Sequence, residues 1–204
     1  MSDDDGGRQG GVVFAADQHV VALVASAGGL DAVERVLEGL PADFPAAVVV
    51  LQHVSPNHPS SLPSILARHA RLAVRPARHG DRLRPGHVLV APPGAHLLVR
   101  PNGTVALSKS APVHYVRPSA DVLFESMAAA FDGRAIAVVL SGMGSDGAEG
   151  ARTLTGRGGV VIAQDEETSA FFAMPHAAIV AGGAKALPID DIAPALCELV
   201  AARA

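Results

Sequence analysis

Aromatic residues are scarce in this chain of 204 residues, where they make up 3% of the composition, with no Trp and a single Tyr. Apolar residues nevertheless account for 49% of the chain. The core must therefore be aliphatic and rich in alanine. Proteins that hold single-stranded nucleic acid commonly stack its bases on aromatic side chains. This composition argues against such a protein, and we expect no nucleic-acid partner.

Cysteines and long apolar runs are also lacking. The one cysteine, Cys197, excludes an internal disulfide, and its place in an apolar helical pattern indicates a packed thiol rather than a nucleophile. No apolar run reaches the roughly 18 residues of a membrane span, and no signal-peptide pattern opens the chain. We therefore expect a cytoplasmic protein without membrane insertion.

Charge is spread unevenly along the chain. The formal net charge is −4, but residues 51–120 contain nine Lys or Arg residues and one acidic residue, Asp81. This basic stretch carries a formal charge of +8, and the remainder of the chain carries −12. A solvated face is the ordinary explanation. The functional alternative is a surface that steers an acidic partner toward a site.

Buried strands alternate with helices through most of the chain. Apolar runs at residues 20–25, 46–52 and 135–140 predict parallel strands covered on both faces. Short strands on either side of residues 101–103 predict an antiparallel hairpin. The pattern predicts a doubly wound, mainly parallel α/β sheet with helices on both faces and a short antiparallel hairpin portion. We expect a flexible tail over residues 1–18 and one domain over residues 19–204.

Three of the predicted strands lead into polar, reactive side chains. Ser26 follows the first strand, His53 follows the second, and Asp146 lies in the glycine-rich loop after the strand at 135–140. Each has an ordinary structural explanation: Ser as a helix cap, His as a satisfied structural residue, Asp as a turn former. Ligands of open α/β sheets bind outside the carboxyl ends of the strands. Their common location therefore favours one functional site.

Ser, His and Asp together make up a nucleophilic triad. The His takes the serine proton, and the Asp orients the imidazole and stabilises its charged form. Backbone N–H groups near Ala27 and in the loop that contains Met143 and Gly144 are candidates to bind the developing oxyanion. The glycines at 28 and 29 could instead cradle a phosphate, although no phosphate-binding motif accompanies them.

The acid of the triad has competitors in the sequence. Asp121 lies at a predicted helix start that Ser119 is expected to cap, and Asp165 follows another predicted strand. We favour Asp146 because its neighbouring glycines let the backbone approach a substrate closely. The chain order Ser, His, Asp differs from that of the α/β-hydrolases, and Val24 breaks their G-x-S-x-G motif.

Several separated motifs are similar to those of a known family. They are VALVASAGGLDAVERVLEGLP, VVVLQHVSP, VLVAPPGAHLLV, VRPSADVLFESMA, VVLSGMGSDGAEGA and AQDEETSAFFAMPHAAI. In this order, over residues 20–196, the chain resembles the catalytic domain of the chemotaxis protein-glutamate methylesterases. The resemblance implies a doubly wound sheet and hydrolysis of glutamyl methyl esters on chemoreceptors, with deamidation of certain receptor glutamines. It places the family's triad on Ser26, His53 and Asp146, and Met143 in the active-site loop.

The chain also departs from the family pattern. The receiver domain that usually precedes the catalytic domain is not among the matching motifs, so we expect a stand-alone methylesterase-like domain. Val24 and Ala27 stand where glycine and threonine are common, and Ala173 and His176 where glycine and arginine are common. None of these changes removes a triad member.

The resemblance leads to expectations about partners and cofactors. The implied partner is the methylated cytoplasmic domain of a chemoreceptor, an acidic helical bundle that the basic stretch would attract. Neither a cofactor nor a metal is expected, because the histidines lack metal-binding spacing. The alternative to an esterase is a non-catalytic, esterase-like interaction module in a sensory signalling pathway.

Overall fold

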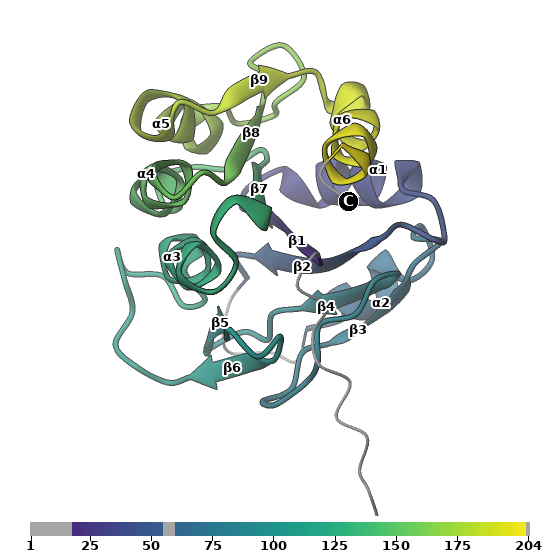
Figure 1. The fold of residues 1–204 in the computed structure, drawn as a ribbon. Helices are drawn as coiled ribbons and strands as arrows, with labels where there is room; N and C mark the ends of the chain where they lie inside the picture. The colour runs from purple at the N-terminus through teal and green to yellow at the C-terminus, as the bar shows by residue number, and fades with distance from the viewer. Residues whose placement is uncertain (1–17, 55–59, 203–204) are drawn as a thin grey trace, which may run out of the picture.

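The apolar runs of the sequence form a central sheet of seven parallel strands (Figure 1). The structure is a computed structural model that describes residues 18–54 and 60–202. The strand order is β3-β4-β2-β1-β7-β8-β9. The strands are β1 (His19–Ala25), β2 (Ala46–Gln52), β3 (Ala73–Pro76), β4 (His87–Val90), β7 (Ala135–Val139), β8 (Val160–Gln164) and β9 (Lys185–Leu187).

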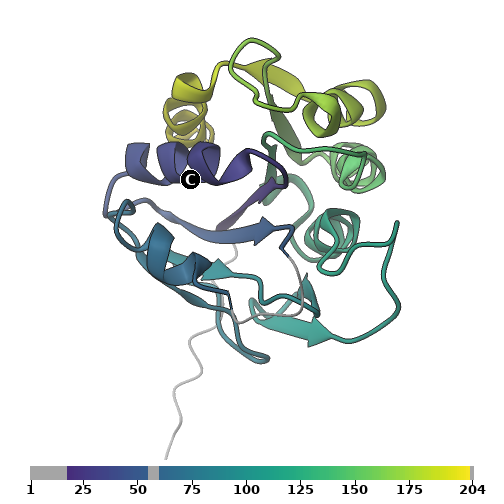
Figure 2. The same ribbon diagram turned by 180° about the vertical axis from the view of Figure 1, so that it is seen from behind.

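Helices cover both faces of this sheet, so the molecule has three layers (Figures 1 and 2). Helices α3, α4 and α5 pack on one face, and α1 and α6 lie on the other together with the short α2. Alternate residues of β1 point into the two cores, with Val24 under α3 and Leu23 under α1. The helices are α1 (Gly29–Gly39), α2 (Leu62–Leu66), α3 (Ala120–Phe131), α4 (Ala148–Gly156), α5 (Ala173–Gly182) and α6 (Ile189–Ala201), with a 3₁₀ turn, η1 (Asp132–Arg134), after α3.

A separate antiparallel hairpin, β5 (His96–Val99) and β6 (Val105–Ser108), packs against α3. This confirms the predicted architecture of a mainly parallel, doubly wound sheet with a short hairpin. The neighbouring apolar run at 87–90 is not part of the hairpin, because it pairs in parallel with β2 and β3 as β4. A four-residue strand carries too little periodicity to show which partner it will pair with.

The order of the strands reverses at β1. The chain leaves β1 through α1 on one face of the sheet, and it leaves β7, on the other side of β1, through α4 on the opposite face. Connections that diverge in this way open a crevice at the carboxyl ends of the two strands. The sequence-predicted site residues follow β1, β2 and β7, which are adjacent in the sheet.

The tail predicted for residues 1–18 lies almost entirely outside the described residues. Pro175 lies in the first turn of α5, where its missing N–H has no intrahelical partner to lose. In the described part of the chain, no helix is both long and apolar enough to cross a membrane.

Candidate active site

Ser26 and His53 lie side by side at the carboxyl edge of the sheet. The strands before them pair in register, Ala25 opposite Gln52, and the N–H of His53 donates to the carbonyl of Ala25 at 3.0 Å. Each residue is the first one after its strand, and both are partly buried. Neighbouring strands are about 4.8 Å apart, so the two side chains begin within reach of each other.

Asp146 reaches His53 from the loop after β7. Its Oδ2 is 2.9 Å from Nε2 of His53, and the carboxylate is 6% exposed. The same oxygen accepts the N–H of Ala120 at 2.6 Å, and Oδ1 accepts the hydroxyl of Ser119 at 2.7 Å. Burial opposes ionisation, but the hydrogen bonds from His53, Ala120 and Ser119 outweigh it and lower the pKa of Asp146. Asp146 is therefore a carboxylate held at the positive end of a helix.

The Ser119 hydroxyl supports Asp146 instead of capping α3. Its side chain makes no capping bond to its own helix, which corrects the prediction from the sequence. Asp146 takes over that function by accepting the N–H groups of Ala120 and, at 3.3 Å, Asp121. Buried His96 braces Ser119, since its Nδ1 accepts the Ser119 N–H at 3.2 Å and its Nε2 lies 3.0 Å from the carbonyl of Ala111.

Asp121 makes the reciprocal contact with α4. Its Oδ1 accepts the N–H of Gly147 at 3.0 Å and that of Gly150 at 2.8 Å, so each of the two helices is capped by a carboxylate beside the other. A Cβ on Gly150 would lie 2.9 Å from Cα of Asp121, so these glycines allow close approach of the loop to α3. Burial, together with the nearby charge of Asp146, raises the pKa of Asp121 to about 6.

The turn after Ser26 packs tightly against the loop after β7. A Cβ on Gly29 would lie 2.7 Å from the carbonyl oxygen of Ser141, and Gly28 adopts a φ of 68°. Gln52 fixes the same turn by donating to the carbonyl of Ser26 at 2.6 Å. The two glycines thus serve close packing of the turn. Val24, one of the departures from the family pattern, is fully buried in the core beneath α3.

Several backbone N–H groups near Ser26 are already bonded. Ser141 donates its N–H to Oε1 of Gln164 at 2.9 Å, and Gly142 donates its N–H to the carbonyl of Phe171 at 2.9 Å. By contrast, the N–H groups of Ala27, Met143 and Gly144 have no hydrogen-bond partner within the described part of the chain. The sequence pointed to the N–H groups near Ala27 and in the loop 141–144 for the oxyanion, and those of Ser141 and Gly142 are occupied. A Cβ on Gly142 would lie 3.0 Å from Cβ of Ser26, so this loop adjoins the serine.

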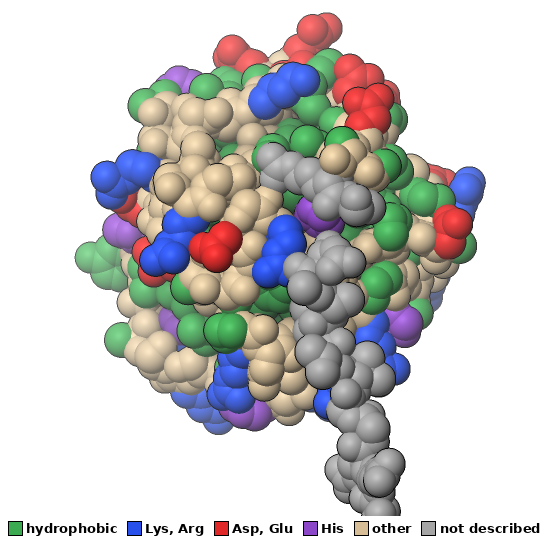
Figure 3. All heavy atoms as spheres, in the orientation of Figure 1, with side chains coloured by type: hydrophobic (Ala, Val, Ile, Leu, Met, Phe, Trp, Pro, Cys, Tyr) green, Lys and Arg blue, Asp and Glu red, His purple; other side chains and the backbone are tan. Residues whose placement is uncertain are grey.

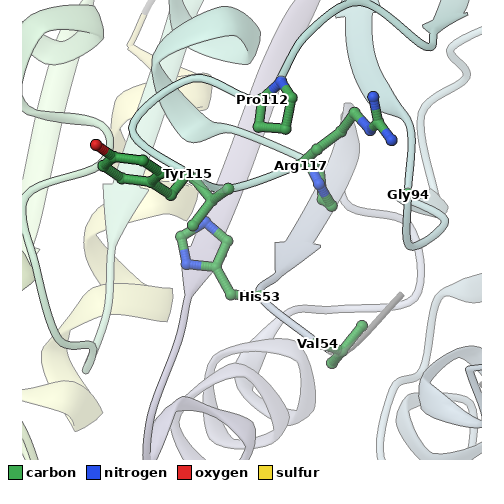
Figure 4. A pocket seen from close by; sticks show the side chains of 8 residues that line it. His53, Val54, Gly94, Pro112, Tyr115 and Arg117 are labelled. Atoms are coloured by element: carbon green, nitrogen blue, oxygen red, sulfur yellow. The ribbon is translucent and has the colours of Figure 1, made fainter. Parts of the chain in front are cut away.

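A pocket of about 200 Å³ opens beside His53 (Figure 4). Its wall is the segment from Pro112 to Pro118, which passes over the imidazole, and Val54 and Gly94 line the other side.

Among the described residues, no group of three or more His, Cys, Asp or Glu side chains is arranged to hold a metal. The second acid considered from the sequence, Asp165, bonds within its own loop to the N–H and hydroxyl of Thr168.

The basic stretch lies away from most of the acidic side chains. Figure 3 shows acidic side chains gathered mainly at the β9–α6 end of the molecule, while Lys and Arg side chains are spread over this face, several of them at the opposite end. Six arginines of this stretch are exposed, and Arg75 instead pairs with Asp81. The exposed ones are Arg68, Arg71, Arg78, Arg82, Arg84 and Arg100.

The supporting residues of the site were missed by the sequence analysis. Ser119, His96, Gln52, Ser141 and Gln164 are all buried polar residues. Gln52, Ser141 and Gln164 end or directly follow apolar strand runs, which is the signal that singled out His53. Such residues are expected to be hydrogen-bonded, but the sequence does not show to what.

Fold and site together define an open α/β protein with a serine and a His–carboxylate pair at its topological switch point. The family model described as CheB methylesterase matches residues 21–196. The chain therefore belongs to the CheB methylesterase family. The solved catalytic domain of Thermotoga maritima CheB methylesterase superposes with a TM-score of 0.86 at 37% identity, over 89% of this chain and 98% of that one.

Two curated relatives illustrate the match in sequence. A protein-glutamate methylesterase/protein-glutamine glutaminase 2 of Anaeromyxobacter dehalogenans is 48% identical over 186 residues, 91% of this chain and 54% of the relative. A protein of the same name, without the number, from Symbiobacterium thermophilum is 41% identical over 194 residues, 95% of this chain and 54% of the relative. The chain thus spans about half the length of the curated relatives it matches.

Proposed function

We propose that this protein is a serine esterase that removes methyl groups from glutamyl esters of chemoreceptors and deamidates receptor glutamines. The observation that carries the proposal is the hydrogen bond from Nε2 of His53 to Oδ2 of Asp146, directly beside Ser26. The names of the curated relatives support the same activity. Ser26 is the nucleophile, His53 the base, and Asp146 the group that orients it.

The contact between His53 and Asp146 supports different tasks for the two nitrogens of His53. Asp146 is a carboxylate and can only accept, so Nε2 of the neutral imidazole carries the proton. Nδ1 is then the acceptor that takes the proton from the Ser26 hydroxyl. That hydroxyl has no hydrogen-bond partner within the described part of the chain, so it remains available to a substrate.

The reaction then proceeds in two half-reactions. Oγ of Ser26 bonds to the ester carbonyl carbon while its proton moves to Nδ1 of His53. The tetrahedral intermediate collapses, the C–OCH₃ bond breaks, and methanol leaves with that proton. Water attacks the acyl-enzyme and gives one proton to Nδ1. Ser26 regains that proton as the C–Oγ bond breaks, and the released glutamic acid loses its remaining proton to solvent as it becomes the carboxylate. The N–H groups of Ala27, Met143 and Gly144 are the donors that we assign to the oxyanion.

A serine-reactive probe and methanol release test the proposal together. Wild-type protein should react covalently with a fluorophosphonate and release methanol from a methylated chemoreceptor fragment. Ser26→Ala should abolish labelling and lower turnover by roughly 10⁴–10⁶-fold, as when other triads are broken. Ser64→Ala, at an exposed position on α2, is the matched control and should leave both unchanged. If Ser26→Ala retains most of the activity, Ser26 is not the nucleophile.

The proposed setting of this reaction is the cytoplasm, with the receptor's helical cytoplasmic domain as the partner. Failure of wild-type protein to label or to release methanol would instead favour a non-catalytic, esterase-like interaction module. The two functions differ only in the chemistry of Ser26, so this experiment separates them.

A further inference from the structure

The wall of the pocket beside His53 ends in a strained hairpin tip formed by His114 and Tyr115. Val113 and Val116 exchange two backbone hydrogen bonds, of 3.1 and 2.9 Å, so the tip is a two-residue turn. His114 has a φ of 49° and Tyr115 a φ of 65°. Positive φ at both central residues defines a type I′ turn, for which Asn-Gly is the favoured sequence. A histidine and a tyrosine in this conformation are unusual and costly.

Hydrogen bonds at the base of this segment tie it to neighbouring residues. The guanidinium of Arg117 donates to the carbonyls of Lys109 and Ser110, at 3.2 and 2.7 Å, and so closes the base of the segment. Nε2 of His96 lies 3.0 Å from the carbonyl of Ala111, and Nε2 of His114 lies 3.8 Å from Oδ2 of Asp121. Strain that the surrounding structure maintains is typical of ligand-binding segments.

Tyr115, the only tyrosine of the chain, is fully exposed at this tip. Tyr115 lines the pocket together with His53, and Figure 4 shows its ring directed away from Arg117. A small ester in that pocket would leave most of the ring in water. Only a macromolecule bound across the site could cover it, and exposed tyrosines that become buried in this way often dominate binding.

Exposed apolar side chains are concentrated around the same edge. In the part of the chain that the structure describes, six large apolar side chains are exposed, and only Val180 on α5 lies elsewhere. The others lie in the segments after β1, β2, β6, β7 and β8; they are Leu30, Val54, Tyr115, Met143 and Phe171. We define these five as the apolar rim. Exposed apolar side chains that cluster in this way mark a contact surface.

We propose that Tyr115 is a specificity-determining residue that packs against apolar side chains next to the esterified glutamate of a protein substrate. This inference rests on the proposed function and refines it, since it names contact with the protein around the ester as the source of selectivity. The rim contacts side chains of the substrate next to the ester. A tip that is already formed by the turn at His114 and Tyr115 lowers the entropy lost on binding.

The test compares a protein ester with a small one. The protein substrate is a chemoreceptor fragment with radiolabelled methyl esters, and the small substrate is p-nitrophenyl acetate. Tyr115→Gly removes the ring and suits the positive φ, so it should raise the midpoint of thermal unfolding by about 2–4 °C. It should also lower the ratio of kcat/KM for the protein ester to kcat/KM for the small ester at least tenfold, through a higher KM for the protein.

Two further variants serve as controls. Tyr115→Phe retains the ring and should keep the ratio within twofold of wild type. Val180→Ser removes an exposed apolar side chain outside the rim and should leave both activities unchanged.

An unchanged ratio in Tyr115→Gly would overturn the inference, as would an equal loss of both activities. Wild-type protein that hydrolyses the small ester but releases no methanol from the receptor fragment would overturn the proposed function itself. The two failures are therefore distinguishable.

Discussion

Replacing Asp121 by asparagine should make the free energy of unfolding less dependent on pH. Oδ1 of Asp121 accepts two N–H groups at the start of α4, and the side-chain amide of the variant would keep that acceptor oxygen. Oδ2 is buried without a hydrogen-bond donor, and the imidazole of His114, 3.8 Å away, is largely exposed. The substitution therefore removes a poorly compensated negative charge while it retains the cap.

The magnitude follows from the pKa of the carboxyl group. Burial and the charge of Asp146 raise the pKa of Asp121 from 3.8 to about 6. A pKa difference of one corresponds to about 1.4 kcal/mol, and partial screening by solvent reduces the total to about 2 kcal/mol. Because the folded state holds this proton more tightly, its contribution to stability is fully present below a pH of about 4, the ordinary pKa of the group. It is lost as the pH rises through about 6.

Urea unfolding followed by circular dichroism at pH values from about 4.5 to about 7.5, at constant ionic strength, measures this effect. The stability of Asp121→Asn relative to wild type should increase by about 1.3 kcal/mol over this range, because about a third of the total effect is already lost at a pH of about 4.5. Asp121→Ala is the control: it removes the acceptor oxygen as well, and the loss of the cap should cost about 1–2 kcal/mol. A difference between Asp121→Asn and wild type that stays constant with pH would refute the reasoning.

Two further predictions concern the support of Asp146 and the docking of substrate. Ser119→Ala removes a hydrogen bond to a carboxylate, so it should cost about 1–2 kcal/mol at pH 7. It should also raise the pKa of Asp146, so the loss shrinks below that pKa, and an equal loss at pH 7 and in acid would contradict this role. If the basic stretch attracts an acidic receptor, kcat/KM for methanol release should fall as NaCl rises from about 50 to about 500 mM, while hydrolysis of a neutral small ester should not. Equal salt responses of the two substrates would rule out this steering.

The sequence by itself determined the sheet and the positions of its functional edge. Apolar runs that are buried on both faces are typical of covered parallel strands, so the strands before Ser26, His53 and Asp146 were identifiable from composition and length. The carboxyl ends of parallel strands meet at one edge, so the candidate residues could be brought together without coordinates. The motif resemblance then assigned a role to each of them.

The tertiary structure alone decided how these residues are held. In the sequence, the glycines near Asp146 favoured this residue because they indicated room for a substrate. In the structure, these glycines allow the loop to approach α3. Ser119 bonds to Asp146 rather than to its own helix, and Asp121 caps α4 in return. These contacts join residues that are far apart in the chain. Their formation depends on how two helices pack side by side, which hydrophobic periodicity does not specify.

The orientation of the His53 ring was likewise decided in three dimensions. The sequence placed a histidine after the strand next to that of Ser26, but it could not show that Nε2 is the ring atom that faces Asp146. That assignment depends on the rotamer of one side chain and on the direction from which the carboxylate approaches. Local sequence sets which groups are available, and only the packing of distant segments sets which atoms meet.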